Sequence, residues 1–436
     1  MQTQLQKLQN PVVGNHGSTC VHKVGNNFES HNDVEKINKG FQYIRELQRV
    51  SRELSKSKTI RNCNTFPVNS TASIYWEPGK GNSNITGMNQ CRNKVFCPRC
   101  SWWAAMENQR VINLVEGHVL SNGGTGIFLT ATIPHHAKSD FRTLNKQINK
   151  CWTKLMNKSR FHKKLVGLHG SKDLIWARGY DCTEGKNGFH PHFHVGLYLL
   201  NQVSTQEFAE LKMLFLWCWN KAVEKIIGKQ SSSKSLDFQR IKTAGKIAQY
   251  FNKVSIEISS NHNKEGFGKS IWQMMEAYSQ TSDIELKKTY KKKINMFEKG
   301  TRKLRSMTFS KGFKELAKKL VDEEQDEEQL EEQSSNREKL TDIRNDLMKL
   351  IHKRRDVIRL HQMIDCYAVG DTKAEPAFIS FMRLCDKYSL ENDLYDDDQM
   401  LKDYNGFIYQ LNLWEQSKEL PDLFSKLFKD ELHFPS

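Results

Sequence analysis

The sequence predicts an α+β protein in which helices pack on a central antiparallel sheet. Residues 189–195 alternate histidine with other residues and run into the apolar stretch 196–200, which is typical of a buried strand. Residues 174–183 predict a second strand, and the Asn-Gly turn between the two runs predicts an antiparallel hairpin. Residues 140–169 and 208–226 carry apolar side chains at helical spacing. Strands and helices therefore alternate in the central part of the chain.

The alternating histidines indicate a metal ion. Alternate side chains of a strand share one face, so His190, His192 and His194 are expected to point the same way. Crowded imidazoles repel one another when protonated but suit a divalent cation when neutral. A two-residue loop at the Asn-Gly turn pairs Asp181 with His194, whereas a four-residue loop pairs it with His192. Either register places the carboxylate on the histidine face, and a three-residue loop would not.

Composition indicates a basic protein of two or three domains. The 436 residues include 66 Lys and Arg against 50 Asp and Glu, a net charge of +16 that favours a polyanionic partner. No run approaches eighteen consecutive apolar residues, and residues 1–4 do not open a signal peptide. We therefore expect a cytoplasmic protein that does not enter membranes. Its ten cysteines are then expected to be thiols or metal ligands rather than disulfides.

A cysteine cluster precedes the predicted sheet. Cys97 and Cys100 have the spacing of a zinc knuckle, in which two thiolates bind one tetrahedral ion. Cys91 could supply a third ligand and Cys63 the fourth. A redox role is the weaker interpretation, because no thioredoxin-like βαβ pattern surrounds the pair. The cluster is therefore a candidate zinc site.

Several motifs resemble those of HUH endonucleases, which include rolling-circle replication initiators, relaxases and related transposases. His192-Phe193-His194 resembles their His-hydrophobic-His motif, and the string HPHFHVGLYLL is most similar to Rep proteins of plasmids and phages. The cysteine cluster, the apolar run 127–133 and the tail 266–314 resemble further segments of these Rep proteins. The resemblance spans residues 60–320 and implies a sheet of the HUH-endonuclease type.

The resemblance also implies a tyrosine nucleophile. Residues 248–253 are similar to the family motif in which a tyrosine cleaves DNA and a lysine assists, which assigns these roles to Tyr250 and Lys253. Tyrosine is a poor nucleophile at its usual pKa of about 10, but nearby cations or a metal-polarised phosphate make attack feasible. Some relatives place a water-activating glutamate four residues before the tyrosine. Here that residue is Lys246, so this role is unassigned.

By the same resemblance, His192 and His194, aided by Asp181 or His190, bind Mg²⁺ or Mn²⁺. Residues 287–314 hold eleven Lys or Arg and one acid, interleaved with aromatic residues, which suits a groove for single-stranded DNA. The candidate DNA-binding residues are Lys246, Lys299, Arg302, Arg305 and Lys311.

The domain organisation follows from these motifs and from an acidic break, since eight of the eleven residues 322–332 are Asp or Glu. The resemblance does not cover the C-terminal residues, which could recruit host proteins or mediate self-association. The expected segments are an N-terminal tail and helix (1–60), a Cys-rich zinc knuckle and helix (61–120), a nicking domain with a basic tail (121–320), an acidic linker (321–338) and a helical C-terminal domain (339–436).

These observations predict a rolling-circle replication initiator that nicks single-stranded or supercoiled origin DNA and works with a host helicase and polymerase. Tyrosine attack would leave a 5′-phosphotyrosine and a free 3′-hydroxyl primer, and strand rejoining would follow. An HUH transposase or relaxase would use the same chemistry, although relaxases usually carry their tyrosine before the histidines. A non-catalytic zinc-dependent DNA-binding regulator and a histidine-ligated hydrolase of small molecules are the alternatives from other classes.

Overall fold

The computed structural model describes residues 31–77, 82–232, 236–242, 245, 268–330, 338–354, 356–368, 370–389 and 396–429. The chain divides into two compact units. The central unit comprises Tyr43–Arg61 and Cys91–Gln333, and the terminal unit comprises Met1–Gln42, Asn62–Gln90 and Ser334–Ser436. This division differs from the five consecutive segments expected from the sequence, because residues 62–90 join the C-terminal residues and residues 43–61 join the central unit.

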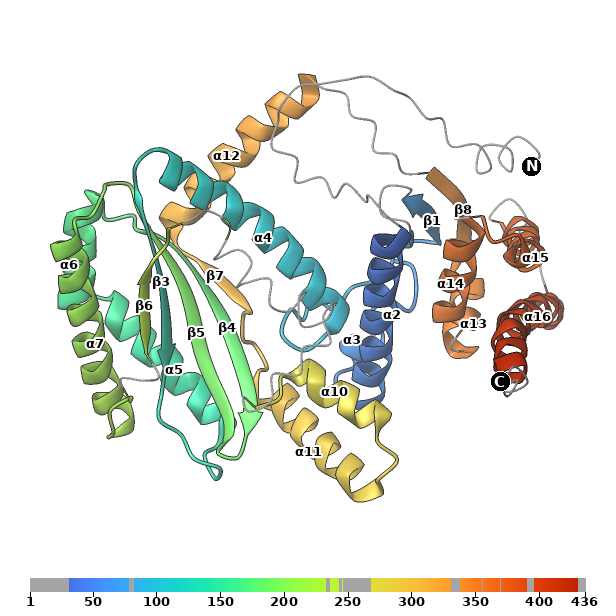
Figure 1. Ribbon diagram of the computed structural model, residues 1–436, viewed down its shortest axis with the longest axis horizontal. Helices are drawn as coiled ribbons and strands as arrows, with labels where there is room; N and C mark the ends of the chain where they lie inside the picture. The colour runs from blue at the N-terminus through green and yellow to red at the C-terminus, as the bar shows by residue number, and fades with distance from the viewer. Residues whose placement is uncertain are drawn as a thin grey trace, which may run out of the picture. The chain divides into compact units, whose positions relative to one another are not determined.

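A five-stranded antiparallel sheet with the strand order β6-β3-β5-β4-β7 forms the middle of the central unit (Figure 1). The two longest strands are the predicted hairpin. The expectation of a mixed α and β protein with an antiparallel sheet is confirmed. The strands are β3 (Thr125–Thr132), β4 (Ile175–Gly185), β5 (Gly188–Leu199), β6 (Asp237–Arg240) and β7 (Met307–Phe309).

The hairpin between β4 and β5 has the register in which Asp181 pairs directly with His192, which is the one expected for a four-residue loop. The strands also pair at Gly185 and Gly188, however, so only Lys186 and Asn187 lie in the turn. Gly188 has a φ of +81°, a left-handed conformation that glycine adopts without the steric penalty of a Cβ. The turn therefore makes the Asp181 carboxylate and the His192 imidazole cross-strand neighbours.

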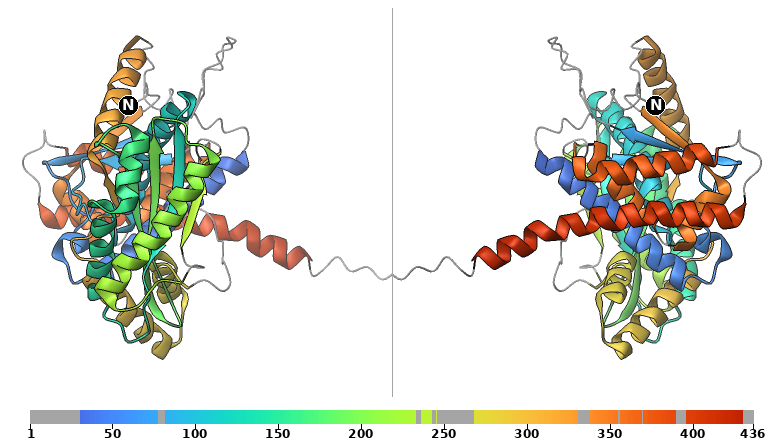
Figure 2. Two further views of the ribbon diagram at one scale, coloured as in Figure 1. Left: turned by 90° about the vertical axis from the view of Figure 1, so that its left-hand side faces the viewer. Right: turned by 90° about the vertical axis from the view of Figure 1, so that its right-hand side faces the viewer.

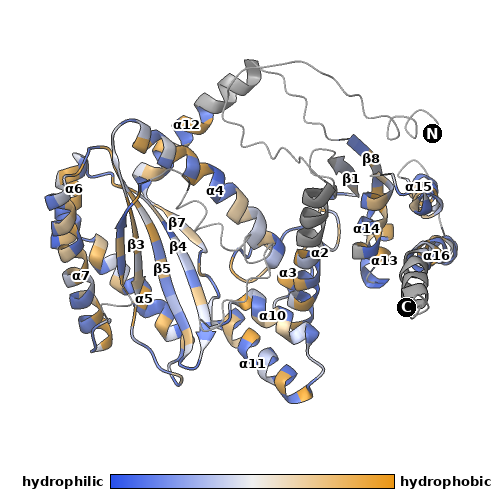
Figure 3. Cartoon of the chain, in the orientation of Figure 1, coloured by the Kyte–Doolittle hydropathy of each residue, from blue (hydrophilic) through white to orange (hydrophobic). Residues whose placement is uncertain are grey.

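Three helices cover one face of this sheet (Figure 2, left). The odd-numbered residues Phe193, Val195 and Leu197 of β5 pack into a core with these helices. Hydrophobic and hydrophilic residues alternate along them, as amphipathic helices require (Figure 3). The helices are α5 (Phe141–Met156), α6 (Arg160–His169) and α7 (Thr205–Ile227).

Two details of this layer differ from a simple helical pattern. Residues 140–169 form two helices, because Lys158 adopts a φ of +60° and Ser159 caps α6 by accepting from the His162 amide. In α7, Phe215 and Trp219 are fully buried, but Trp217 is 49% exposed. The aromatic residues of α7 therefore belong to the core on one side of the helix only.

The opposite face of the sheet packs on other helices over part of its length. Val115 of α4 (Pro98–Ser121) and Phe313 of α12 (Lys311–Leu330) share a core with the even-numbered Tyr198 of β5. His192 and His194 have the same parity as Tyr198, so they point to this face. His192 and His194 therefore lie on one face of the sheet, and the helix layer of α5 to α7 lies on the other.

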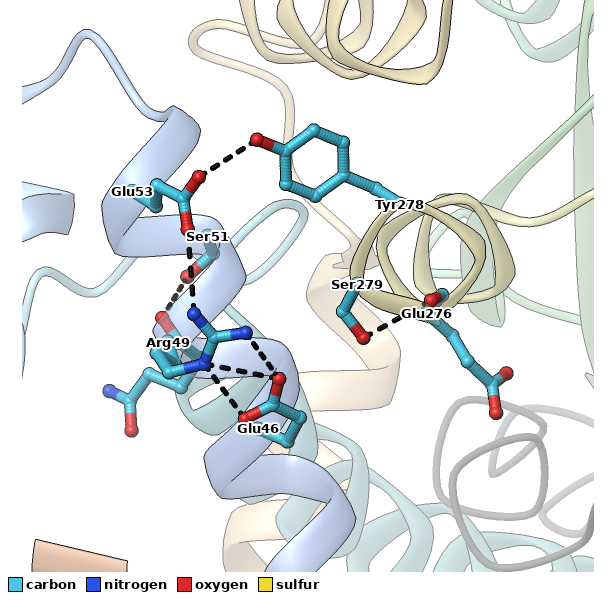
Figure 4. A network of polar contacts seen from close by, with 8 residues as sticks. Glu46, Arg49, Ser51, Glu53, Glu276, Tyr278 and Ser279 are labelled. Atoms are coloured by element: carbon cyan, nitrogen blue, oxygen red, sulfur yellow. Dashed lines mark hydrogen bonds and ion pairs between the residues drawn. The ribbon is translucent and has the colours of Figure 1, made fainter. Parts of the chain in front are cut away.

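The C-terminal half of α2 is held in the central unit by polar contacts with α10 (Figure 4). The Tyr278 hydroxyl donates to the Glu53 carboxylate at 2.8 Å. Arg49 donates to Glu46 at 2.6 Å and lies 3.5 Å from Glu53. The Tyr278–Glu53 hydrogen bond and the core that Leu47 shares with Met275 link residues 43–61 to the central unit, whereas the Arg49 contacts lie within α2. The helices of this region are α2 (His31–Leu54), α3 (Lys58–Arg61), α10 (Ile271–Gln280) and α11 (Ile284–Gly300).

The terminal unit has its own sheet, with the strand order β2-β1-β8. Ala72 pairs with Ile343, and Ser73 donates to Asp342 at 2.6 Å. The described residues from 338 onward open with strand β8, which pairs with β1, and continue mostly as helices, and the expected helical C-terminal domain (339–436) stays a prediction. The elements are β1 (Thr71–Glu77), β2 (Asn82–Thr86), β8 (Glu338–Arg344), α13 (Asn345–Arg354), α14 (Val357–Ala368), the 3₁₀ helix η3 (Thr372–Ala374), α15 (Glu375–Lys387) and α16 (Asp397–Lys429).

Among the described residues, no helix combines the length and the apolar composition that a membrane crossing requires.

We expect Phe193→Ala to destabilise the central unit by about 3–5 kcal/mol, because the ring is 1% exposed and fills the core beneath the helix layer. Urea unfolding followed by tryptophan fluorescence measures this, since Trp152 lies 6.2 Å from the Phe193 ring. Leu200→Ala is the control: Leu200 is 47% exposed, and its loss should change stability by less than about 0.5 kcal/mol. Equal effects of the two substitutions would contradict this account of the core.

Candidate metal centres

Asp181, His192 and His194 form a compact group on the face of the sheet opposite the helix layer. Their potential ligand atoms all lie within 4.8 Å of one another. Oδ2 of Asp181 is 3.1 Å from Nε2 of His192 and 3.8 Å from Nε2 of His194. Two atoms that each lie about 2.1 Å from one ion are separated by about 3.0 Å at right angles and about 3.6 Å at 120°. The spacing thus fits three ligands of a single divalent cation.

Neighbouring groups orient these ligands. Nδ1 of His192 lies 3.1 Å from the carbonyl oxygen of His190, which can only accept, so Nδ1 carries the hydrogen. In a neutral His192, the lone pair of Nε2 therefore faces the carboxylate of Asp181. Two acceptors at 3.1 Å repel each other unless a proton or a metal cation lies between them. The donor set is therefore arranged for a cation.

The other polar atoms of Asp181 and His194 also have hydrogen-bond partners, which fix how the two side chains are oriented. Oδ1 of Asp181 accepts from the Cys182 amide at 2.7 Å, which leaves Oδ2 directed to the histidines. Nδ1 of His194 lies 3.1 Å from the hydroxyl of Thr130, its cross-strand partner on β3. Such second contacts hold a ligand in one orientation and reduce the entropy lost when the metal binds.

His190 lies next to this group but makes a different contact. Its Nδ1 is 3.3 Å from Nδ1 of His135, and the two rings are 4.7 Å apart. Burial, followed by the neighbouring His192 and His135, lowers the pKa of His190 to about 4. Of the two candidates expected to aid His192 and His194, the structure brings Asp181 into the ligand group, while His190 faces His135.

A cavity of about 100 Å³ opens beside the Asp-His-His group. Asp181 and His194 line it from the sheet, Asn108 and Trp272 from helices α4 and α10, and Lys94 from the segment before α4. A ligand in this cavity contacts the candidate metal ligands directly, beside amide and ammonium donors that suit a phosphate.

The four cysteines predicted as zinc ligands form a second group. The sulfur atoms of Cys63, Cys91, Cys97 and Cys100 all lie within 4.8 Å of one another. Sγ of Cys91 is 3.7 Å from Sγ of Cys100, close to the separation of about 3.8 Å expected for two thiolates on a tetrahedral ion with bonds of about 2.3 Å. No disulfide joins any two of these four cysteines. The donor set and its spacing fit a tetrahedral metal site.

Local structure explains how these cysteines meet. The Asn64 amide donates to the carbonyl of Asn89 at 2.8 Å, so Cys63 and Cys91 flank paired backbone segments. Cys97 is the N-cap of α4, and Cys100 lies in its first turn. The positive end of a helix favours negatively charged ligands such as thiolates.

The predicted tyrosine nucleophile lies outside the described residues. The same holds for Lys253 and Lys246. The described residue nearest to Tyr250 along the sequence is Gly245, whose amide donates to Oε1 of Glu116 at 2.9 Å. Glu116 is fully buried on α4. Sequence reasoning missed this glutamate, because a single acid in a helical pattern usually indicates a solvent-exposed position.

The other candidate DNA-binding residues are exposed. Lys299 ends helix α11, Arg302 and Arg305 follow it, and Lys311 begins α12. Lys311 lies 3.4 Å from Asp173, and the hydrogen bond to this carboxylate raises its pKa. An exposed pair of this kind contributes little to stability, so Lys311 can exchange it for another anion.

The fold and these two groups define a mixed α and β protein with two candidate metal centres. A family model described as replication protein matches residues 82–357, more than half of the chain, and the chain belongs to this family of replication proteins. No curated protein and no solved structure matches it. The family confirms the resemblance to replication initiators and implies interaction with origin DNA.

We expect His192→Ala and His194→Ala each to weaken Mn²⁺ binding at least about tenfold, because each removes one of three ligands. Calorimetric titration of the intact chain with Mn²⁺ measures the dissociation constant. His136→Ala is the matched control, since His136 is exposed and lies outside the group. An unchanged dissociation constant in both ligand variants would show that the group does not hold the ion.

Proposed function

We propose that this protein is a rolling-circle replication initiator of the HUH type, which nicks single-stranded origin DNA and rejoins it. The observation that carries the proposal is the Asp-His-His group, whose carboxylate faces an imidazole lone pair at 3.1 Å inside a replication protein. Membership of the family supports a role in initiating replication. The nicking chemistry and its metal dependence are the further step proposed here.

In this proposal Asp181, His192 and His194 hold Mg²⁺ or Mn²⁺ beside the cavity, with His190 and its partner His135 flanking the group. The bound cation would supply Lewis-acid polarisation of the scissile phosphate. Lys94 lines the same cavity and can balance the charge that develops on the phosphate oxygens. The chain's own residues thereby position a phosphate before any bond changes.

The proposed nucleophile is the phenolic oxygen of Tyr250. It forms a bond to phosphorus while the bond from phosphorus to the 3′ oxygen breaks, which leaves a 5′-phosphotyrosine and a 3′-hydroxyl. Lys253 would assist by lowering the tyrosine pKa or by balancing negative charge. The phosphodiester bond energy is kept in the tyrosine ester, so attack by a 3′-hydroxyl can rejoin the strand without ATP. The 3′-hydroxyl left by nicking can meanwhile prime a host polymerase after a host helicase has separated the strands.

The remaining assignments follow the same proposal. Lys246, Lys299, Arg302, Arg305 and Lys311 would contact the DNA backbone. A replication initiator acts where the DNA of its replicon lies, which we take to be the cytoplasm. Zn²⁺ is the ion proposed for the cysteine group.

The test of the function is a denaturing-gel assay for a covalent adduct between the protein and single-stranded DNA of its own replicon, in the presence of Mn²⁺. We expect Tyr250→Phe to abolish the adduct, because phenylalanine has no nucleophilic oxygen. Tyr409→Phe should leave it unchanged, since Tyr409 is exposed on α16 of the terminal unit, outside both metal groups and the basic tail.

An adduct that persists in Tyr250→Phe would move the nucleophile to another residue. Metal-dependent binding of DNA without any adduct would favour a non-catalytic regulator. An adduct formed only on transposon ends would favour a transposase.

For the cysteine group, we expect Cys100→Ser to lower the bound zinc from about one ion per chain to well below half, because three ligands hold zinc poorly at a structural site. Elemental analysis after dialysis measures the metal content. Cys366→Ala is the control, since Cys366 lies outside the group. Unchanged zinc in Cys100→Ser would contradict the assignment.

A further inference from the structure

The helix layer of α5, α6 and α7 carries an excess of positive charge that the metal centres do not explain. Helices α5 and α6 with the turn between them, residues 141–169, contain eight Lys or Arg and no Asp or Glu. With α7 the layer holds eleven cations against three acids, which is half of the net charge of the whole chain. Charge of this density on so few residues favours a polyanionic partner.

The cations of α5 form a row on its outer side. Arg142, Lys146, Lys150 and Lys154 follow one another at intervals of four residues. The helical rise gives steps of about 6 Å and a row about 18 Å long. Arg142, Lys146 and Lys150 are exposed, because the apolar residues between them point into the core. Lys158, also exposed, continues the row in the turn that follows.

Two cations of this layer are held next to each other. Lys154 of α5 lies beside Lys225 of α7, and burial together with this like charge lowers the pKa of Lys154. Two of the three acids of α7 have other partners: Glu207 accepts from the N-cap Ser204, and Glu210 pairs with Lys164 at 2.7 Å. Adjacent ammonium groups repel each other, and an anion such as phosphate relieves that repulsion.

An exposed tryptophan accompanies the cations. Trp217 is 49% exposed, and Arg160 and Lys221 lie 5.2 and 5.8 Å from the centre of its ring. The cation–aromatic contacts keep these two side chains at the surface of the layer rather than free in solvent. Together with the row on α5, these residues place basic side chains on all three helices, whose ribbons cover one face of the sheet in Figure 2 (left).

We propose that the outer face of α5, α6 and α7 binds the phosphate backbones of duplex DNA. The face is built from helices and has one exposed aromatic side chain among its large exposed hydrophobic residues, whereas single-strand grooves use several aromatics as stacking platforms. Duplex DNA has one phosphate per strand every 3.4 Å or so along its axis, so the row on α5 spans about five base pairs.

This surface is separate from the nicking site. Phe193 points to the helix layer, while His192 and His194 on either side of it point to the opposite face. The sheet and its core lie between the two. The proposal shares with the proposed function only its DNA partner, and it does not depend on the tyrosine chemistry.

The test compares two triple variants of the full chain with the same loss of charge. One carries Lys150→Gln, Lys154→Gln and Lys158→Gln in the helix layer. The control carries Lys353→Gln, Lys373→Gln and Lys402→Gln, which are exposed lysines of the terminal unit. Fluorescence anisotropy measures the affinity for a duplex fragment of the origin across a range of salt concentrations.

We expect the helix-layer variant to bind duplex DNA at least about tenfold more weakly and to lower the salt slope by about two to three, near 0.9 per lost phosphate contact. The control should match the unmutated chain. Trp217→Ala should weaken duplex binding without changing the slope, because it removes no charge. Adduct formation on a short single-stranded oligonucleotide should stay unchanged in all these variants.

A salt slope that is the same in the helix-layer variant and the control would overturn the proposal. Equal loss of duplex and short single-strand binding would also overturn it, in favour of a single-strand surface. Absence of any adduct in the unmutated chain would count against the nicking function, but the duplex measurement would still decide this inference.

Discussion

The pairing of β4 with β5 is the constraint on which the central unit depends. Because side chains alternate along a strand, the register that places Asp181 opposite His192 also directs Phe193 and Val195 into the core. A slip by one residue would bury the imidazoles among apolar helices and expose the phenylalanine. The free energy of the core therefore fixes the geometry of the candidate metal group on the opposite face.

The metal group itself is costly to fold without a cation. His192 and His194 are 8% and 5% exposed, and a carboxylate faces the nearer imidazole. Burying polar groups with acceptors opposed is unfavourable, and the packing of the strand on its other face offsets this cost. The same arrangement means that a bound cation stabilises the folded state, because the unfolded chain does not gather the three ligands.

Sequence reasoning succeeded where the signal is local. The alternation of histidines, the Asn-Gly turn and the CxxC spacing each involve residues close in sequence, and the structure contains the corresponding hairpin and cysteine group. The choice between two registers stayed open in the sequence, because both obey the same alternation. The structure pairs Asp181 with His192, and the strands meet at a two-residue turn of Lys186 and Asn187 that precedes Gly188, whose φ is left-handed.

Prediction from the sequence failed where the residues in contact lie far apart in the chain. Strand β8 pairs with β1 across more than 260 residues, and neither strand has an apolar run that separates it from its surroundings. The contact of His190 with His135 likewise joins strand β5 to the segment after β3, and no periodicity in the sequence connects the two. The sequence alone does not single out Glu116, because only the folded structure shows its hydrogen bond with the Gly245 amide. Such features depend on the fold as a whole, so a single sequence does not encode them in any local pattern.

In the proposed function, the two faces of the sheet have different roles. A nicking site needs a cavity in which ligands converge on one phosphate, and the cavity lined by Asp181, His194 and Lys94 would provide it. Holding a duplex needs cations spread over many phosphates, and the basic residues of the helices packed on the other face would provide them. Since the strand between them is rigidly paired on both edges, a duplex held on one face and a single strand on the other would stay at a fixed separation. Such a separation matches what initiation requires, because the strand to be cut must leave the duplex before it reaches the metal group.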